Sequence, residues 1–219
     1  MKRHLQAELE GLKKQILSLG TMAEERVKMA IHAFETRDGA LAERIIAIDK
    51  EIDEAEVELE EECLKILALY QPVAADLRFV VAALKINNDL ERMGDLAKNI
   101  AKRVSQLAKV EQIELPPEIR TMAMQAQEMV KQCLDAVINA DPVLARQVRE
   151  EDDAVDEARQ KIRQRVLRGI QAGPENVESL LRINSVSKHI ERLADMATNV
   201  AEDVIYMVEG DIVRHRMTD

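Results

Sequence analysis

The chain has 219 residues, of which 47% are hydrophobic, 33% charged and 2% aromatic, and its formal net charge at pH 7 is −10. Binding a nucleic-acid backbone requires a basic surface, and base stacking requires aromatic side chains, so the composition excludes nucleic acid as the expected partner. Abundant Ala, Leu, Glu, Lys and Arg, without convincing alternating runs of β-branched or aromatic residues, predicts an all-α chain of long packed helices.

Helix-breaking residues divide the chain into six predicted helices. The first begins near Leu5, and the six are expected to end near Ala33, Leu69, Lys109, Ala140, Ile170 and Val208. Two adjacent prolines, Pro116 and Pro117, favour an extended linker between the third and fourth helices. The expected domains are therefore residues 1–110 and 116–219, with three helices in each.

The two halves contain the same sequence patterns. Glu91–Val104 reads ERMGDLAKNIAKRV and Glu191–Val204 reads ERLADMATNVAEDV, which are identical at half of their positions. A second pattern, D-x-x-[IV]-D-E-A, occurs at Asp49–Ala55 and Asp152–Ala158. Two shared segments in the same order indicate an internal duplication of about 100 residues.

Apolar residues in these helices recur at alternating spacings of three and four. This spacing is typical of helices packed nearly antiparallel in a bundle. The seam of the third helix is Leu90, Met93, Ala97, Ile100, Val104 and Leu107, and that of the sixth is Ile190, Leu193, Ala197, Val200, Val204 and Met207. The second helix has Ile45, Ile48, Ile52, Ala55, Leu59, Cys63 and Ile66. The predicted fold is two tandem three-helix bundles.

Acidic residues spaced four apart lie beside or opposite these seams in each half. The first set is Asp49, Asp53, Glu91 and Asp95, and the second is Asp152, Asp156, Glu191 and Asp195. A solvated polar face is the simpler explanation of any single pair. However, like charges four residues apart cost roughly 0.2–0.5 kcal/mol, and carboxylates about 6 Å apart repel by roughly 0.7 kcal/mol per pair even in water. Arg92 and Arg192 could neutralise part of this charge, and a multivalent cation is the sharper hypothesis.

The candidate ligands are all oxygen donors, with the side-chain amides of Asn99 and Asn199 as further contributors. Mg, Ca, Mn or iron suit such a set, whereas Zn usually recruits His or Cys. No histidine completes the E-x-x-H motif of buried di-iron bundles, and His189 is expected to be a packing or surface residue.

Two cysteines, Cys63 and Cys133, lack CxxC spacing, and a reduced core thiol is expected. The N-terminal residues show no apolar region of a signal peptide, and the longest apolar run, Phe79–Leu84, is too short to span a bilayer. A cytoplasmic protein is the expectation.

The chain resembles the PhoU family, the regulatory proteins of bacterial phosphate transport. The resemblance is carried by QPVAADLR at Gln71–Arg78, by Leu84–Ile86, by DLERMGD at Asp89–Asp95 and by ERLADMATN at Glu191–Asn199. The doubled E-R-x-x-D-x-A-x-N is specific, and the resemblance covers essentially the whole chain.

This resemblance implies multinuclear metal clusters, with iron expected first and Mn, Mg, Ca or Zn as alternatives. One cluster would use Asp49, Asp53, Glu91 and Asp95, and the other Asp152, Asp156, Glu191 and Asp195. It also implies a non-enzymatic negative regulator of phosphate uptake and of the phosphate-starvation response. The implied partners are the nucleotide-binding subunit of the phosphate ABC importer and a sensor histidine kinase, with membrane association only through them; a homodimer is expected.

Two other functions are compatible with the sequence. A metal-dependent hydrolase or oxidase would use the carboxylate cluster with an open coordination position and a substrate pocket. A structural helical module would leave the carboxylates without metal. No nucleophile elbow or P-loop is present to favour an enzyme.

Overall fold

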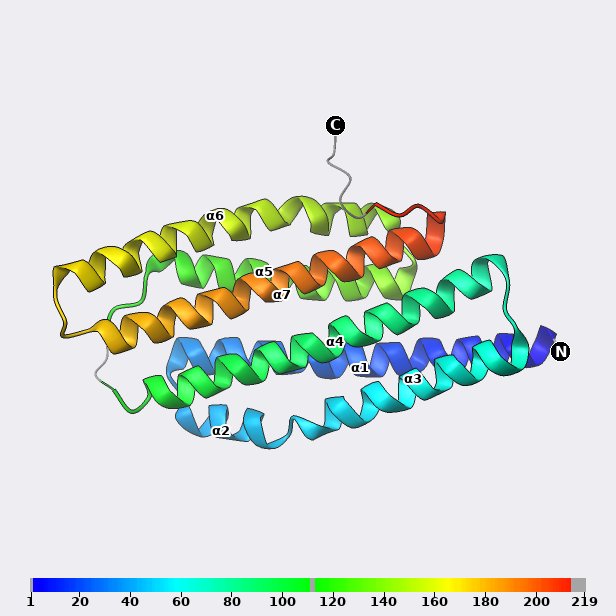
Figure 1. Ribbon diagram of the computed structural model, residues 1–219, viewed down its shortest axis with the longest axis horizontal. Helices are drawn as coiled ribbons and strands as arrows, with labels where there is room; N and C mark the ends of the chain where they lie inside the picture. The colour runs from blue at the N-terminus through cyan, green and yellow to red at the C-terminus, as the bar shows by residue number, and fades with distance from the viewer. Residues whose placement is uncertain (1, 111–112, 214–219) are drawn as a thin grey trace.

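The computed structural model describes residues 2–110 and 113–213, and this part of the chain is helical with no strand. The all-α prediction is confirmed. The helices are α1 (Lys2–Thr36), α2 (Gly39–Ala47), α3 (Lys50–Tyr70), α4 (Ala74–Leu107), α5 (Pro117–Asn139), α6 (Pro142–Ala172) and α7 (Val177–Glu209), as Figure 1 shows.

The second predicted helix was expected to be continuous, and the structure divides it into α2 and α3. Ile48 leaves the helical conformation at φ −96° and ψ 10°. The Ile52 N–H then donates to the carbonyl oxygen of Asp49 at 3.1 Å, one residue closer than in an α-helix. Ile45 and Ile52 are buried on either side of the break. Because the apolar seam continues across it, the sequence pattern gave no sign of the interruption.

Other helix ends follow from recognisable local chemistry. The Asp38 carboxylate accepts a hydrogen bond from the Leu41 N–H at 2.9 Å and so caps the N-terminus of α2. Asp141 caps α6 by accepting from the N–H groups of Val143 and Leu144 at 2.9 and 3.1 Å. Pro142 occupies the first turn of that helix, where its missing N–H costs nothing.

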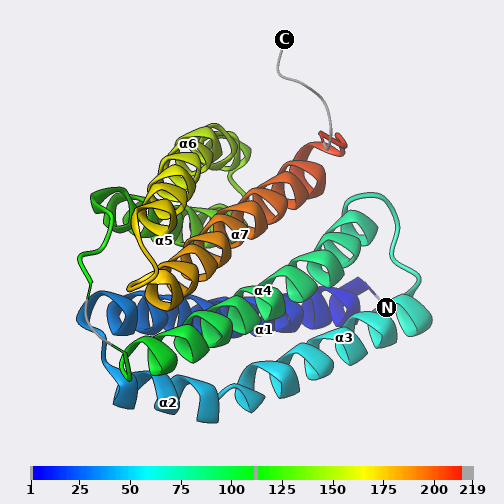
Figure 2. The ribbon, with the colours of Figure 1, turned by 60° about the vertical axis from the view of Figure 1, so that its left-hand side comes forward.

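The helices form two bundles that pack along their lengths. In the first, α1, α3 and α4 contact one another and α2 covers α1 and α4; in the second, α5, α6 and α7 pack together. Figure 2 shows the two bundles meeting where α4 lies beside α7, and α1 also contacts α5. The buried side chains of both halves belong to one continuous hydrophobic core. The duplicated helices therefore form the junction between the halves.

The predicted seams form much of this core. The six residues of the α4 seam are buried, and in α7 only Met207 is partly exposed. Cys63 and Cys133 are buried free thiols, as expected. Burial raises the pKa of the Cys63 thiol to about 12 and also raises that of Cys133, so both resist ionisation.

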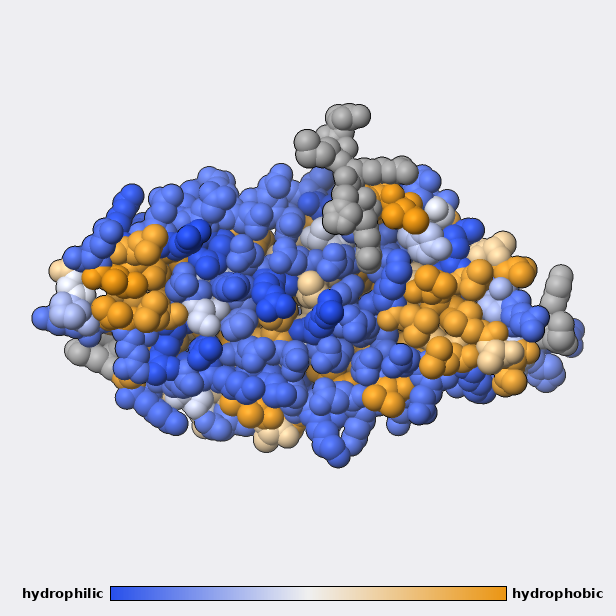
Figure 3. All heavy atoms as spheres, viewed as in Figure 1, coloured by the Kyte–Doolittle hydropathy of each residue, from blue (hydrophilic) through white to orange (hydrophobic). Residues whose placement is uncertain are grey.

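Figure 3 shows a largely hydrophilic middle and apolar side chains gathered towards both ends of the molecule. Large exposed apolar residues include Leu69, Val73 and Leu77 around the α3–α4 connection, and Leu167 and Leu181 near the α6–α7 turn. In the described residues, no helix combines the length and the apolar composition that crossing a membrane requires.

Candidate metal centres

The first acidic site lies where α3 packs against α4. A Cβ added at Gly94 would lie 2.8 Å from Cδ1 of Ile52, so the two helices approach closely because position 94 has no side chain. Asp53 sits in the first turn of α3, and Glu91 and Asp95 lie on the facing helix. Asp49 precedes α3, at the break in the second predicted helix, and is only 8% exposed. The sequence pattern predicts that Asp49 lies on or near the surface, so its burial differs from the prediction.

Lys98 supplies a positive charge within the first site. Its ammonium forms an ion pair with the Asp49 carboxylate, and its Nζ lies 3.7 Å from Oδ1 of Asp95. The hydrogen bond to Asp49 raises the pKa of Lys98, more than its partial burial lowers it. Two of the four carboxylates that were expected to share a metal, Asp49 and Asp95, therefore share the Lys98 ammonium.

The remaining carboxylates of this site interact unfavourably. Burial, followed by the charges of Asp95 and Asp53, raises the pKa of Glu91. Burial, followed by the charges of Glu60 and Asp53, also raises the pKa of Glu56. Glu56 lies one turn beyond Asp53 and was absent from the predicted set. Its place in the helical series after Asp49 and Asp53 was the signal that could have identified it.

The second acidic site lies between α6 and α7, and there α6 continues through Asp152 without a break. Burial, together with the charges of Asp195 and Asp156, raises the pKa of the Asp152 carboxyl to about 6. Burial and the charges of Glu191 and Asp156 likewise raise the pKa of Asp195. The structure thus brings all four predicted carboxylates of this half within electrostatic reach of one another.

Arg159 supplies the cation of the second site. Its Nε donates to Oε2 of Glu191 at 3.2 Å, and its Nη1 donates to Oδ1 of Asn184 at 3.2 Å. Oδ1 of Asp152 is buried without a hydrogen-bond partner, and so is Oγ1 of Thr198, which lies one turn after Asp195 on α7. Buried polar atoms without partners are costly, so these two oxygens are candidate ligands for a cation.

Across the described residues, no group of three or more His, Cys, Asp or Glu side chains converges closely enough to hold a metal ion in the conformation seen. The donor chemistry nevertheless fits a hard cation, because every candidate ligand is an oxygen and the charges are only partly balanced. The second site fits better, since its two unpartnered oxygens are available. In the first, Lys98 would have to move away from Asp49.

The two asparagines and His189 line other pockets. Asn99 and His189 share one pocket with Arg103, and Asn199 lines another with Asp89. Burial, with the positive charges of Arg103 and Arg192, lowers the pKa of His189 to about 4, so it is neutral at pH 7.

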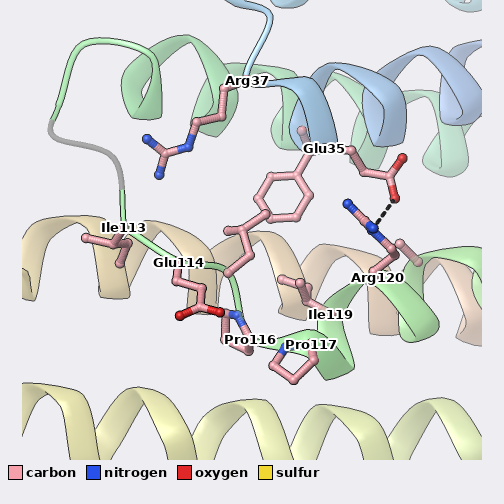
Figure 4. A pocket seen from close by; sticks show the side chains of 11 residues that line it. Glu35, Arg37, Ile113, Glu114, Pro116, Pro117, Ile119 and Arg120 are labelled. Atoms are coloured by element: carbon pink, nitrogen blue, oxygen red, sulfur yellow. Dashed lines mark ion pairs between the residues drawn. The ribbon is translucent and has the colours of Figure 1, made fainter.

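A further pocket of about 460 Å³ lies where the linker passes between α1 and α5. Figure 4 shows Arg37 directed towards this space and the ion pair between Glu35 and Arg120, whose Oε1 and Nε atoms are 3.6 Å apart. Pro116 and Pro117 line the same pocket, as expected for an extended linker. None of the eight predicted metal ligands lines it.

Comparison with protein families gives a match in both halves. The PhoU domain matches residues 16–104 and 119–204, which include all eight predicted ligands. A protein of Aquifex aeolicus named "Phosphate-specific transport system accessory protein PhoU homolog" is 38% identical over 209 residues, covering 95% of each chain. The Pseudomonas aeruginosa protein of the same name is 37% identical over 212 residues, covering 95% of this chain and 87% of the relative.

Solved structures show the same architecture. PhoU from Pseudomonas aeruginosa superposes with a TM-score of 0.91 at 35% identity, covering 94% of this chain and 99% of that one. The phosphate transport system regulatory protein PhoU from Streptococcus pneumoniae gives a TM-score of 0.88 at 29% identity, covering 95% and 99%. The tandem three-helix arrangement predicted from the sequence is confirmed by these structures.

Proposed function

This chain belongs to the PhoU family, and we propose that it is a negative regulator of phosphate uptake and of the phosphate-starvation response. The observation that carries the proposal is similarity over 95% of the chain to proteins named as accessory proteins of phosphate-specific transport. Those names describe accessory proteins, and no catalytic activity is part of the proposal.

The proposed protein acts in the cytoplasm as an adaptor. Its partners would be the nucleotide-binding subunit of the phosphate ABC importer and the sensor histidine kinase, and it would reach the membrane only through them. A homodimer is the proposed assembly. The net charge of −10 suits contact with basic protein surfaces.

We further propose that the two acidic sites hold metal, with iron as the first candidate. The first site would use Asp49, Asp53, Glu91 and Asp95 from the α3–α4 pair. The second would use Asp152, Asp156, Glu191 and Asp195 from α6 and α7. Bound metal would neutralise mutually repelling carboxylates and cross-link neighbouring helices. The unpartnered oxygens of Asp152 and Thr198 support this role for the second site.

Deletion of the gene tests the regulatory proposal. Loss of the protein should give high expression of phosphate-starvation genes in phosphate-rich medium, and the wild-type chain supplied in trans should restore repression. Affinity purification of the tagged full-length chain from membranes should recover the importer's nucleotide-binding subunit. Expression that stays phosphate-regulated after the deletion would contradict the proposal.

A structural module without metal is the second candidate, because Lys98 and Arg159 already pair with carboxylates of the two sites. Metal analysis of protein purified without chelators or affinity metals distinguishes the metal-cluster hypothesis from the metal-free module. Bound metal that is lost after Asp95→Ala and Asp195→Ala supports the clusters, whereas metal-free protein that still regulates supports the module.

A further inference from the structure

A pocket of about 430 Å³ lies at the junction of the two halves. It is formed by residues of α2, α4, the segment after α4, and α7, and none of the eight carboxylates lines it. The residues of this basic pocket are Ile46, Asn99, Lys102, Arg103, Ser105, Gln106, Lys109 and His189.

Positive charge in the basic pocket is poorly compensated. The half-buried Arg103 donates from Nε to Oγ of Ser185 at 3.1 Å and from Nη1 to Oε1 of Gln106 at 3.2 Å, and both acceptors are neutral. Neither Lys102 nor Lys109 forms an ion pair within residues 2–110 and 113–213. Nδ1 of His189 is buried without a hydrogen-bond partner.

One carboxylate close to the pocket offsets part of the positive charge of its three cations. It belongs to Glu43, which accepts a hydrogen bond from Ser105 on the pocket wall. Arg182, which also donates to Gln106, is paired with Glu178. These contacts leave the lysines and Arg103 as the cations available to a ligand.

The internal duplication provides a comparison for this arrangement. Position 103 corresponds to Asp203, and position 185 corresponds to Lys85. At that equivalent place Lys85 forms an ion pair with the buried Asp203, with Nζ and Oδ1 3.1 Å apart. A carboxylate therefore neutralises Lys85, whereas the contacts of Arg103 at the equivalent place are with neutral acceptors.

We propose that the basic pocket binds a phosphate-class oxyanion containing two or more phosphoryl groups. Lys102, Arg103 and Lys109 line one pocket at the end of α4, and a chain of phosphoryl groups carries more negative charge than a single phosphate, so it can pair with more of these cations at once. Arg103 provides the donor geometry that phosphate oxygens prefer. No aromatic residue lines the pocket, so the ligand is recognised through phosphate and not through a nucleoside base.

Such a ligand would bridge α4 of the first half and α7 of the second, at the junction that carries the duplicated helices. A regulator of phosphate uptake could then respond to an intracellular phosphate compound directly; this link, though not the binding itself, rests on the proposed function.

Calorimetric titration of the full-length chain with tripolyphosphate, after removal of metal by chelation, tests the proposal. The pocket variant carries Lys102→Gln and Lys109→Gln. Its matched control carries Lys13→Gln and Lys131→Gln, two exposed lysines on other helices, so both variants have the same net charge. Exposed sites are chosen so that folding is preserved.

The wild type should bind one tripolyphosphate per chain, and more tightly than it binds orthophosphate. Each lost charge-assisted contact is expected to weaken binding by about tenfold, so the pocket variant, which loses two, should bind about a hundredfold more weakly while the control stays near wild type. Equal weakening in the two variants, tighter binding of orthophosphate, or no saturable binding to the wild type would overturn the proposal. The gene deletion tests the regulation of phosphate genes separately from ligand binding. The binding proposal can therefore be contradicted while the regulatory proposal holds, and the reverse.

Discussion

The two acidic sites have the same four-carboxylate pattern but differ in which helix supplies the neutralising cation. In the first site Lys98 comes from α4 and engages Asp49; its counterpart in the second half is Thr198. In the second site Arg159 comes from α6 and engages Glu191; its counterpart in the first half is Glu56. Each half thus has one basic residue in its acidic site, and the two residues are at non-equivalent positions.

Because of this difference, the two sites should not bind a metal ion equally well. Lys98 forms an ion pair with Asp49, and Asp49 is the least exposed of the four carboxylates of the first site. Arg159 engages only Glu191 in the second site and leaves Asp152 with an unpartnered oxygen. The second site should therefore accept a cation first.

The largest effect is expected from Lys98→Met, which removes the internal cation and keeps a long apolar stem. A unit charge about 4 Å from a carboxylate is worth up to about 4 kcal/mol at an effective dielectric near 20. Even part of this corresponds to roughly tenfold to hundredfold tighter binding of Mn²⁺ at the first site. Titration monitored by Mn²⁺ electron paramagnetic resonance measures it.

The same substitution should destabilise the metal-free chain, because it leaves Asp49 buried without its partner. Lys50→Met, which removes an exposed lysine from a neighbouring position, is the matched control. Unchanged Mn²⁺ affinity in the Lys98 variant would show that the amine does not compete with metal.

The next largest effect is expected from Asp152→Asn in metal-free protein. The folded-state pKa of about 6 exceeds the ordinary value of 3.8, so the folded chain holds this proton more tightly than the unfolded chain. The resulting penalty is absent below about pH 4, grows between pH 4 and 6 and is complete above pH 6. The shift corresponds to at most about 3 kcal/mol, which solvent screening at this half-buried site reduces to about 1–2 kcal/mol.

The substitution should therefore increase the free energy of unfolding at pH 7 by about 1–2 kcal/mol and leave it unchanged below pH 4. Urea denaturation at several pH values measures the difference. Asp49→Asn should instead destabilise the chain, because it removes the partner of Lys98. Stabilisation by both substitutions, or by neither, would contradict the assigned difference between the sites.

A smaller effect is expected from Gly94→Ala, which adds a methyl group 2.8 Å from Cδ1 of Ile52. Overpacking typically costs about 1–3 kcal/mol, and the better helix propensity of alanine returns about 1 kcal/mol, so a net loss of about 1 kcal/mol is expected. Ile52→Val in the same chain should recover much of it, because the second half carries Ala194 and Val155 at the corresponding positions. Thermal unfolding of the single and double variants measures the recovery; a double variant no more stable than Gly94→Ala would contradict this packing explanation.

The fold was predictable because its main signals are repeated and local. A packed helix face is indicated by the spacing of Leu90, Met93 and Ala97, which recurs 100 residues later. This signal does not depend on the rest of the structure. The capping aspartates Asp38 and Asp141 similarly mark two helix starts. The break before Asp49 was not predictable, because it depends on a few backbone dihedral angles within an uninterrupted apolar pattern.

The spacing of the acidic residues was visible in the sequence, but the charge balance around them was not. Two carboxylates four residues apart are visible in a sequence, whereas the contact between Lys98 and Asp49 joins different helices. Glu56 could have been found by extending the helical series beyond Asp53. Arg159, at the equivalent position, shows that the same extension in the second half reaches a residue of opposite charge.

The most direct test of this account is a Mn²⁺ titration of the metal-free wild type and of two double variants. One variant carries Asp152→Asn and Asp195→Asn, and the other carries Asp49→Asn and Asp95→Asn. We predict that the tighter class of sites in the wild type disappears in the first variant and persists in the second. Loss of the tighter class only in the second variant, or no saturable binding by the wild type, would contradict the assignment of the second site as the stronger cation site.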